Sequence, residues 1–142
     1  MDAKELATKV VDQMYNNDPF SQWLGIERVE DGEGTSILKM TVRKEMLNGF
    51  DIAHGGITYS LADSALAFAS NSHGQKSVSI ETSISHLESV KEGDVLIAIA
   101  KEVSITNKLA RYEIIVTNQD NIKVALFKGT VYRTGKDWFS GV

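Results

Sequence analysis

The stretch HGGITYSLADSALAFASN, residues 54–71, is apolar almost all round when it is drawn as a helix. A helix of this kind has no face for water, so it must be surrounded by protein. It spans about 25 Å at 1.5 Å per residue, a length that strands of about ten residues match. Small side chains keep it thin, at Ala62, Ala65, Ala67 and Ala69. The stretch therefore predicts a central helix against which a curved antiparallel sheet packs closely.

The segments on both sides of this helix predict strands. Residues 25–42 contain the turn signal Asp31-Gly32-Glu33-Gly34 and an alternating apolar pattern, which favours a two-stranded hairpin. Four apolar runs rich in β-branched residues follow the helix, at 76–87, 94–105, 110–118 and 122–134. Because only short turn-like segments separate these runs, we expect each run to lie antiparallel beside the next.

The amino-terminal segment predicts a short amphipathic helix over residues 3–16, which ends at Asn16-Asn17-Asp18-Pro19. The element order is then helix, two strands, helix and four strands. Residues 1–142 contain no internal repeat, linker or low-complexity segment. We therefore expect a single α+β domain that covers the whole sequence.

Composition narrows the chemistry. The 142 residues include no cysteine, which excludes disulfides, thiolate zinc sites and cysteine nucleophiles. A net charge of −4 without a basic run argues against nucleic acid as a partner. No apolar run is long enough for a membrane span, and residues 1–5 lack the features of a secretory signal. We expect a cytoplasmic protein that binds neither nucleic acid nor membrane.

Asp63 is a carboxylate in the middle of this apolar helix, and the apolar pattern gives no reason for it. Isolated buried carboxylates are costly, and most of them find a partner or become protonated. No Lys or Arg occurs between Lys44 and Lys76 to pair with it locally. Asp63 is therefore either a structural carboxylate bonded to backbone groups or a functional acid.

Two groups of residues carry a resemblance to a known family. The segment NGFDIAHGG at 48–56, followed by SLAD at 60–63, resembles the active-site segment of the hotdog-fold acyl-CoA thioesterases, in particular the PaaI (phenylacetic acid degradation) branch. The likeness continues through VSIETSISH at 78–86 and VALFKGT at 124–130, and it covers about residues 20–134. It implies a hotdog fold, in which a curved antiparallel β-sheet wraps around a long central α-helix.

The resemblance also implies a reaction. A member of this family hydrolyses an acyl-CoA, here with an aryl or medium-chain acyl group, to the free acid and CoA. Coenzyme A enters as part of the substrate, and no other cofactor is implied. Two departures from the family pattern concern acyl-group preference: His86 stands where an aromatic residue or leucine is common, and residues 88–90 lack a proline that many members carry.

The family pattern assigns a role to Asp63. The corresponding acid acts from one subunit on a thioester held at the helix amino terminus of the other, as nucleophile or as general base. Gly55 and Gly56 would form the oxyanion hole, since first-turn N–H groups lack intrahelical partners and lie at the positive end of the helix dipole. Gly55 is the preferred donor. The structural alternative is that these glycines only permit a tight entry into the helix.

Five further residues are candidates with alternatives of their own. Asn48 holds either the water or the carbonyl, or it only forms a turn with Gly49. His54 orients the substrate or Asn48, or it has a structural role as a helix-capping or packing residue. Ser79 matches a family position near the attacking water, although serine in a sheet is more often structural. Lys108 and Arg111 are candidates for the CoA phosphates, or they are solvated surface cations. His73 and His86 show no metal-ligand spacing, and we predict no metal site.

The exposed edges of a single curved sheet need a partner, and the family pairs two sheets edge to edge. We expect a homodimer and, beyond it, a homotetramer. The alternatives to a thioesterase are a noncatalytic acyl-CoA sensor and a hotdog hydratase or dehydratase. The segment with Trp138 and Phe139 has no predicted function and docks either on its own subunit or on a neighbour.

Overall fold

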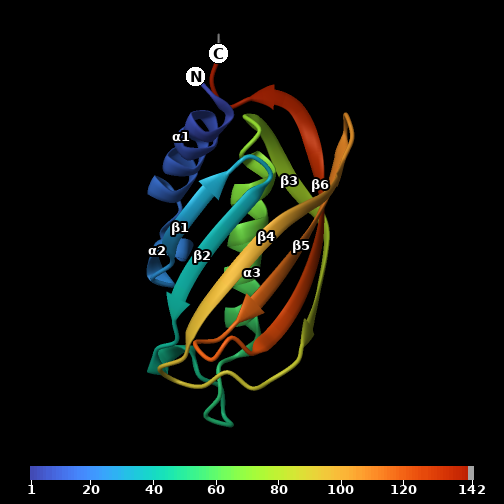
Figure 1. Ribbon diagram of the computed structural model, residues 1–142. Helices are drawn as coiled ribbons and strands as arrows, with labels where there is room; N and C mark the ends of the chain where they lie inside the picture. Colours follow the sequence, from blue (N-terminus) through green and yellow to red (C-terminus); the bar gives the residue numbers. More distant parts are fainter. Residues whose placement is uncertain (141–142) are drawn as a thin grey trace.

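The computed structural model describes residues 1–140, which form one six-stranded antiparallel sheet around a central helix (Figure 1). The helices are α1 (Ala3–Asn16), α2 (Pro19–Trp23), the short 3₁₀ helix η1 (Lys44–Met46) and α3 (Gly55–Asn71). The strands are β1 (Glu27–Gly32), β2 (Thr35–Thr41), β3 (Gln75–His86), β4 (Val95–Ile105), β5 (Leu109–Thr117) and β6 (Lys123–Asp137). The predicted α+β arrangement is confirmed.

Helix α3 is the predicted central helix. His54 is its N-cap, and its buried residues face the sheet over most of its length. The core lies between α3 and the inner face of the sheet, where large side chains such as Leu61 and Phe68 meet Leu96, Ile114 and Phe127. No helix within residues 1–140 combines the length and the apolar character that a membrane span requires.

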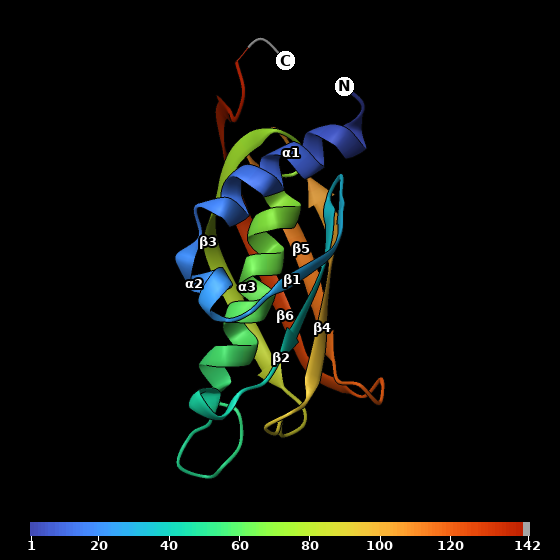
Figure 2. The same ribbon diagram turned by 90° about the vertical axis from the view of Figure 1, so that its left-hand side faces the viewer.

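Helix α1 lies across the carboxyl-terminal half of α3, on the side that the sheet leaves open (Figure 2). Asp2 caps its amino terminus by accepting a hydrogen bond from the Glu5 N–H at 2.8 Å. Val10 and Val11 of this helix are buried. The short helix α2 was not predicted. It begins with a proline in its first turn, and its N-cap Asp18 accepts a hydrogen bond from the Ser21 N–H at 3.0 Å.

The prediction that the strand after α3 pairs with the next strand is wrong. The strand order is β1-β2-β4-β5-β6-β3, so β3 pairs with β6 and β4 pairs with β2. The connection from β3 to β4 crosses the end of the sheet at the start of α3 (Figure 1), where Ala53 N–H donates to the Val90 carbonyl at 2.6 Å. Val90 is buried in the core, and this burial anchors the crossing segment. Lys91-Glu92-Gly93-Asp94 is therefore a bend in a crossover and not the turn of a hairpin.

This topology leaves β3 at one edge of the sheet. Its apolar residues Val78 and Ile80 are 55% and 60% exposed, and the outward backbone groups of the strand have no neighbouring strand among the described residues. A long edge strand with exposed apolar side chains is suited to pair with a second chain.

Candidate active site

Asp63 is half-buried and faces a cavity of about 440 Å³ between α3 and β3. Within residues 1–140 no cation lies within salt-bridge distance of its carboxylate, and no hydrogen bond to that carboxylate is present. Burial raises the pKa of Asp63 above its usual range. The carboxylate is thus partly stripped of water without a compensating partner, a state typical of reactive acids and bases.

Ser79 of β3 lines the same cavity as Asp63. The structure therefore brings together these two predicted residues, from α3 and from the facing strand.

Gly55 is the first residue of α3, and its N–H has no acceptor among residues 1–140. The N–H of Gly56, in contrast, donates to Nδ1 of His54 at 3.2 Å. This bond makes His54 a helix-capping residue, which is one of the structural alternatives for it. Of the two glycine N–H groups, the one at Gly55 is free to meet a substrate oxygen.

The cavity beside Gly55 has a volume of about 410 Å³ and also contains Asn48, Thr58 and His86 in its walls. A Cβ atom added to Gly55 would lie 3.2 Å from Nε2 of His86. Glycine here keeps a passage open between the helix start and the end of β3.

Asn48 has a structural role in this cavity wall. Its Oδ1 accepts the Phe50 N–H at 2.8 Å, and its backbone N–H donates to the Ile52 carbonyl at 2.8 Å. The predicted turn is therefore present. The Nδ2 group has no acceptor among the described residues, so it remains available to a ligand in the same cavity as Gly55.

Four other candidates lie outside both cavities. His54 faces a separate cavity on the opposite side of the helix start, together with Gly56. Lys108 lies in the turn between β4 and β5. This turn is at the end of the sheet away from the start of α3 (Figure 1). Arg111 of β5 projects from the outer face of the sheet.

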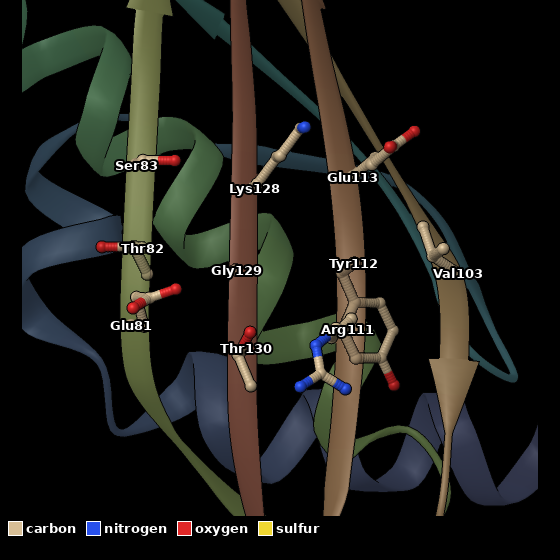
Figure 3. Close-up of a pocket in the computed structure, with 10 residues that line it drawn as sticks. All are labelled: Glu81, Thr82, Ser83, Val103, Arg111, Tyr112, Glu113, Lys128, Gly129 and Thr130. Atoms are coloured by element: carbon tan, nitrogen blue, oxygen red, sulfur yellow. The ribbon is translucent and has the colours of Figure 1, made fainter.

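Figure 3 shows Arg111 with its neighbours in a shallow outer cavity of about 320 Å³. The charged side chains there point away from α3, and they come from three strands: Glu81, Arg111, Glu113 and Lys128. Two acids accompany the two cations, so this cavity offers no strongly positive surface.

The residues around Gly55 and the residues around Asp63 do not meet within one chain. Gly55 and Asp63 are eight residues apart on α3, which corresponds to about 12 Å along the helix axis. They line different cavities. A thioester carbonyl that accepts a hydrogen bond from Gly55 therefore cannot contact Asp63 of the same chain.

No group of three or more His, Asp or Glu side chains that could hold a metal ion is found within residues 1–140. His73 is bonded instead to Glu102, with 2.6 Å between Nε2 and Oε1. His86 lies beside Gly55.

Comparison with known proteins places the chain in a family. Residues 50–125, which include Gly55 and Asp63, match the model of the Thioesterase superfamily. The chain belongs to the thioesterase superfamily. The resemblance drawn from residues 48–63 is confirmed, and so is the predicted class of enzyme, a thioester hydrolase.

Three known proteins are similar to this chain over most of their length. A protein of Archaeoglobus fulgidus whose name suggests an esterase is 45% identical over 94% of this chain and 87% of its own. The acyl-coenzyme A thioesterase PaaI of Escherichia coli is 39% identical over 86% of this chain and 87% of its own. Its solved structure superposes with a TM-score of 0.94 at 36% identity, covering 96% of this chain and 99% of that chain. A Streptococcus mutans protein with bound acetyl-CoA superposes with a TM-score of 0.77 at 31% identity, covering 79% and 90%. The hotdog fold is confirmed by these superpositions.

The sequence does not predict the positions of two residues that line these cavities. In the sequence His86 is only a departure from the family pattern, yet it lies beside the free N–H of Gly55. Trp138 lines the cavity that Asp63 faces. Neither placement has a local sequence signal, because both depend on β3 pairing with β6.

Proposed function

We propose that this protein hydrolyses an acyl-CoA, with an aryl or medium-chain acyl group, to the free acid and CoA. The observation that carries the proposal is the half-buried carboxylate of Asp63, which has no partner and a raised pKa. Relatives named as an acyl-CoA thioesterase and solved with acetyl-CoA support CoA as the thiol part of the substrate. Water is the only co-substrate that the reaction needs.

Asp63 supplies the attacking electrons in one of two ways. As a general base it removes a proton from water while the water oxygen bonds to the thioester carbon. As a nucleophile its own oxygen bonds to that carbon, and water then cleaves the resulting anhydride. In both routes the carbon–sulfur bond breaks and CoA leaves as the thiol after it gains a proton. A poorly hydrated carboxylate favours either step.

Gly55 supplies the oxyanion stabilisation. Its N–H is free and lies at the positive end of the α3 dipole, where a negative oxygen is favoured. The Nδ2 group of Asn48 lines the same cavity and adds a second donor for the carbonyl oxygen or the attacking water.

The site is completed by a second subunit. Because about 12 Å of helix separates Gly55 from Asp63, the thioester held at Gly55 of one chain meets Asp63 of another. The exposed apolar edge of β3 supports a two-fold dimer through this strand. Ser79, which belongs to β3 and lines the same cavity as Asp63, would then lie at the interface and face the attacking water.

We further propose that two such dimers form a tetramer through the outer face of the sheet. Across four strands the register aligns one apolar row: Ile37, Ile99, Ile115 and Leu126. A parallel row carries charges of both signs: Lys101, Glu113 and Lys128. An apolar row beside alternating charges can pair with a rotated copy of itself.

The test is release of CoA thiol from phenylacetyl-, benzoyl- and straight-chain acyl-CoAs, measured with a thiol reagent. The chain has no cysteine and so gives no background. We expect turnover by the wild type and a loss of orders of magnitude in Asp63→Asn and Asp63→Ala. Asp120→Asn, at an exposed acid in the turn between β5 and β6, is the matched control and should retain full activity.

Binding of acyl-CoA without turnover would contradict the proposal and would make the protein a sensor. If turnover occurs, hydrolysis in ¹⁸O-labelled water detects a nucleophilic route in which water attacks the Asp63 carbonyl of the anhydride. Label recovered in the Asp63 carboxylate after repeated turnovers identifies the nucleophile, because only the anhydride route exchanges that oxygen.

A further inference from the structure

We propose that Trp138 forms the inner end wall of the acyl pocket and limits the acyl group to an aryl or medium-length apolar one. The inference rests on the proposed function of Asp63 and assigns a role in specificity to a residue outside the matched family segment of residues 50–125.

The cavity that Asp63 faces extends along α3 toward its carboxyl-terminal end. Its helical wall runs from Asp63 through Leu66 to Asn71, which is about 12 Å along the axis at 1.5 Å per residue. Trp138 lies at the Asn71 end, and the reactive carboxylate lies at the other. The side walls are mainly apolar and come from four elements: Met14, Leu66, Val78 and Val131.

Trp138 is held firmly in this position. Its indole N–H donates to Oδ1 of Asn71 at 2.9 Å, and its backbone N–H donates to the Gly74 carbonyl at 2.8 Å. The ammonium group of Lys76 lies 5.1 Å from the centroid of the indole ring. These contacts come from α3 and from the start of β3, so the wall is fixed to the scaffold of the pocket itself.

The uncharged polar groups at this end of the pocket already have partners. Oδ1 of buried Asn71 also accepts the Ser77 N–H at 2.9 Å, and its Nδ2 donates to the Ala67 carbonyl at 2.9 Å. The Ser70 hydroxyl donates to the same Ala67 carbonyl at 3.2 Å. An uncharged polar or a cationic acyl terminus would therefore enter a mainly apolar space in which the uncharged polar groups are already paired. An apolar chain or ring loses nothing there and gains contact with the indole face.

The experiment compares kcat/KM for phenylacetyl-, hexanoyl-, octanoyl-, dodecanoyl- and hexadecanoyl-CoA among the wild type, Trp138→Phe and Trp138→Ala. We expect Trp138→Ala to gain about tenfold or more on the longest chains relative to octanoyl-CoA and to lose activity on phenylacetyl-CoA. Trp138→Phe keeps an aromatic wall and should lie between the other two. Trp23→Phe, which changes the other tryptophan, is the control and should keep the wild-type profile.

A profile that is the same for all three residues at position 138 would overturn the inference while leaving the proposed function in place. A second readout does not depend on turnover. In Trp23→Phe, Trp138 is the only tryptophan, and its emission should shift with hydrolysis-resistant thioether analogues in a way that depends on the acyl group. An emission that responds equally to free CoA and to every analogue would also overturn the inference. Failure of the wild type to cleave any CoA thioester overturns the proposed function alone, and the fluorescence titration then decides the role of Trp138 in binding.

Discussion

A Cβ atom on Gly129 would lie 2.5 Å from Cδ2 of Leu66, closer than packed carbon atoms can approach. Gly129 faces α3 from β6, and Leu66 is only 1% exposed, so neither side has room to move. We predict that Gly129→Ala lowers the free energy of unfolding by about 1–3 kcal/mol, as overpacking of a core does. Urea denaturation measures this change. Gly49→Ala, where no atom lies within 4 Å of the added Cβ, is the control and should change stability much less.

Gly55→Ala should separate activity from stability. The new methyl group meets only the end of the exposed His86 ring, so we expect no loss of stability. The methyl group also occupies the space through which a carbonyl reaches the Gly55 N–H, and kcat/KM should fall about 100-fold. The double variant Gly55→Ala, His86→Ala tests the cause. Recovery of activity in the double variant would show that a displaced His86 is responsible and not obstruction of the N–H.

Asp63→Asn should stabilise the fold at neutral pH while it abolishes activity. Because burial raises the pKa of Asp63, the folded state disfavours the charged carboxylate, and this cost is fully present above the folded-state pKa. The cost fades as the pH falls through that pKa and is gone below the ordinary value of 3.8. Denaturation at several pH values and one protein concentration checks this. A stability difference that grows toward acid pH would contradict it.

The contact between Tyr112 and Glu102 gives a pH dependence of opposite sign. Burial alone would raise the pKa of Glu102, but hydrogen bonds from Tyr112 and His73 hold it below its ordinary value of 4.5. The Tyr112 hydroxyl donates to Oε1 of Glu102 at 2.7 Å. We predict that Tyr112→Phe costs about 1–2 kcal/mol at neutral pH. This cost should shrink as Glu102 becomes protonated below pH 4.5. A loss that is equal at pH 7 and pH 3 would show that only packing had changed.

Ile80→Lys should dissociate the proposed dimer. Ile80 is 60% exposed on the free edge of β3, so a single chain tolerates a lysine there. Two like charges brought together across a two-fold edge would repel each other. We expect sedimentation to show a smaller species and thioesterase activity to fall with it. A monomeric variant with full activity would contradict a site shared between subunits.

The sequence predicts the helices and strands of this fold better than it predicts which strands pair. The limits of α3 are predictable to one residue because an apolar helical period, a capping His54 and an entry through glycines coincide. The partner of β3 is not predictable from local signals, since residues 91–94 bend the chain in the same way in a hairpin and in a crossover. The short helix α2 is missed for a related reason, because Pro19 both ends one helix and begins another.

In the site too, local sequence signals identify individual residues but not the contacts that depend on strand order. Asp63 stands out in the sequence because a carboxylate interrupts an apolar helix, and the free N–H at Gly55 follows from its place in the first turn of α3. Eight residues of helix predict that these two residues lie about 12 Å apart along the axis, but they do not predict that the two line different cavities. The approach of His86 to Gly55 and of Trp138 to Asn71 is not foreseeable, because each contact depends on strand order.

The position of β6 between β5 and β3 has a consequence for folding during synthesis. Strand β3 emerges from the ribosome long before residues 123–137, and β6 is its only partner among the described strands. Until β6 is made, β3 exposes both of its edges and α3 lacks part of its cover. Such long-range pairing slows folding and leaves aggregation-prone intermediates. Nascent chains that stall between β5 and β6 should therefore depend on chaperones, and the same late strand that completes the sheet also delivers Trp138 to the acyl pocket.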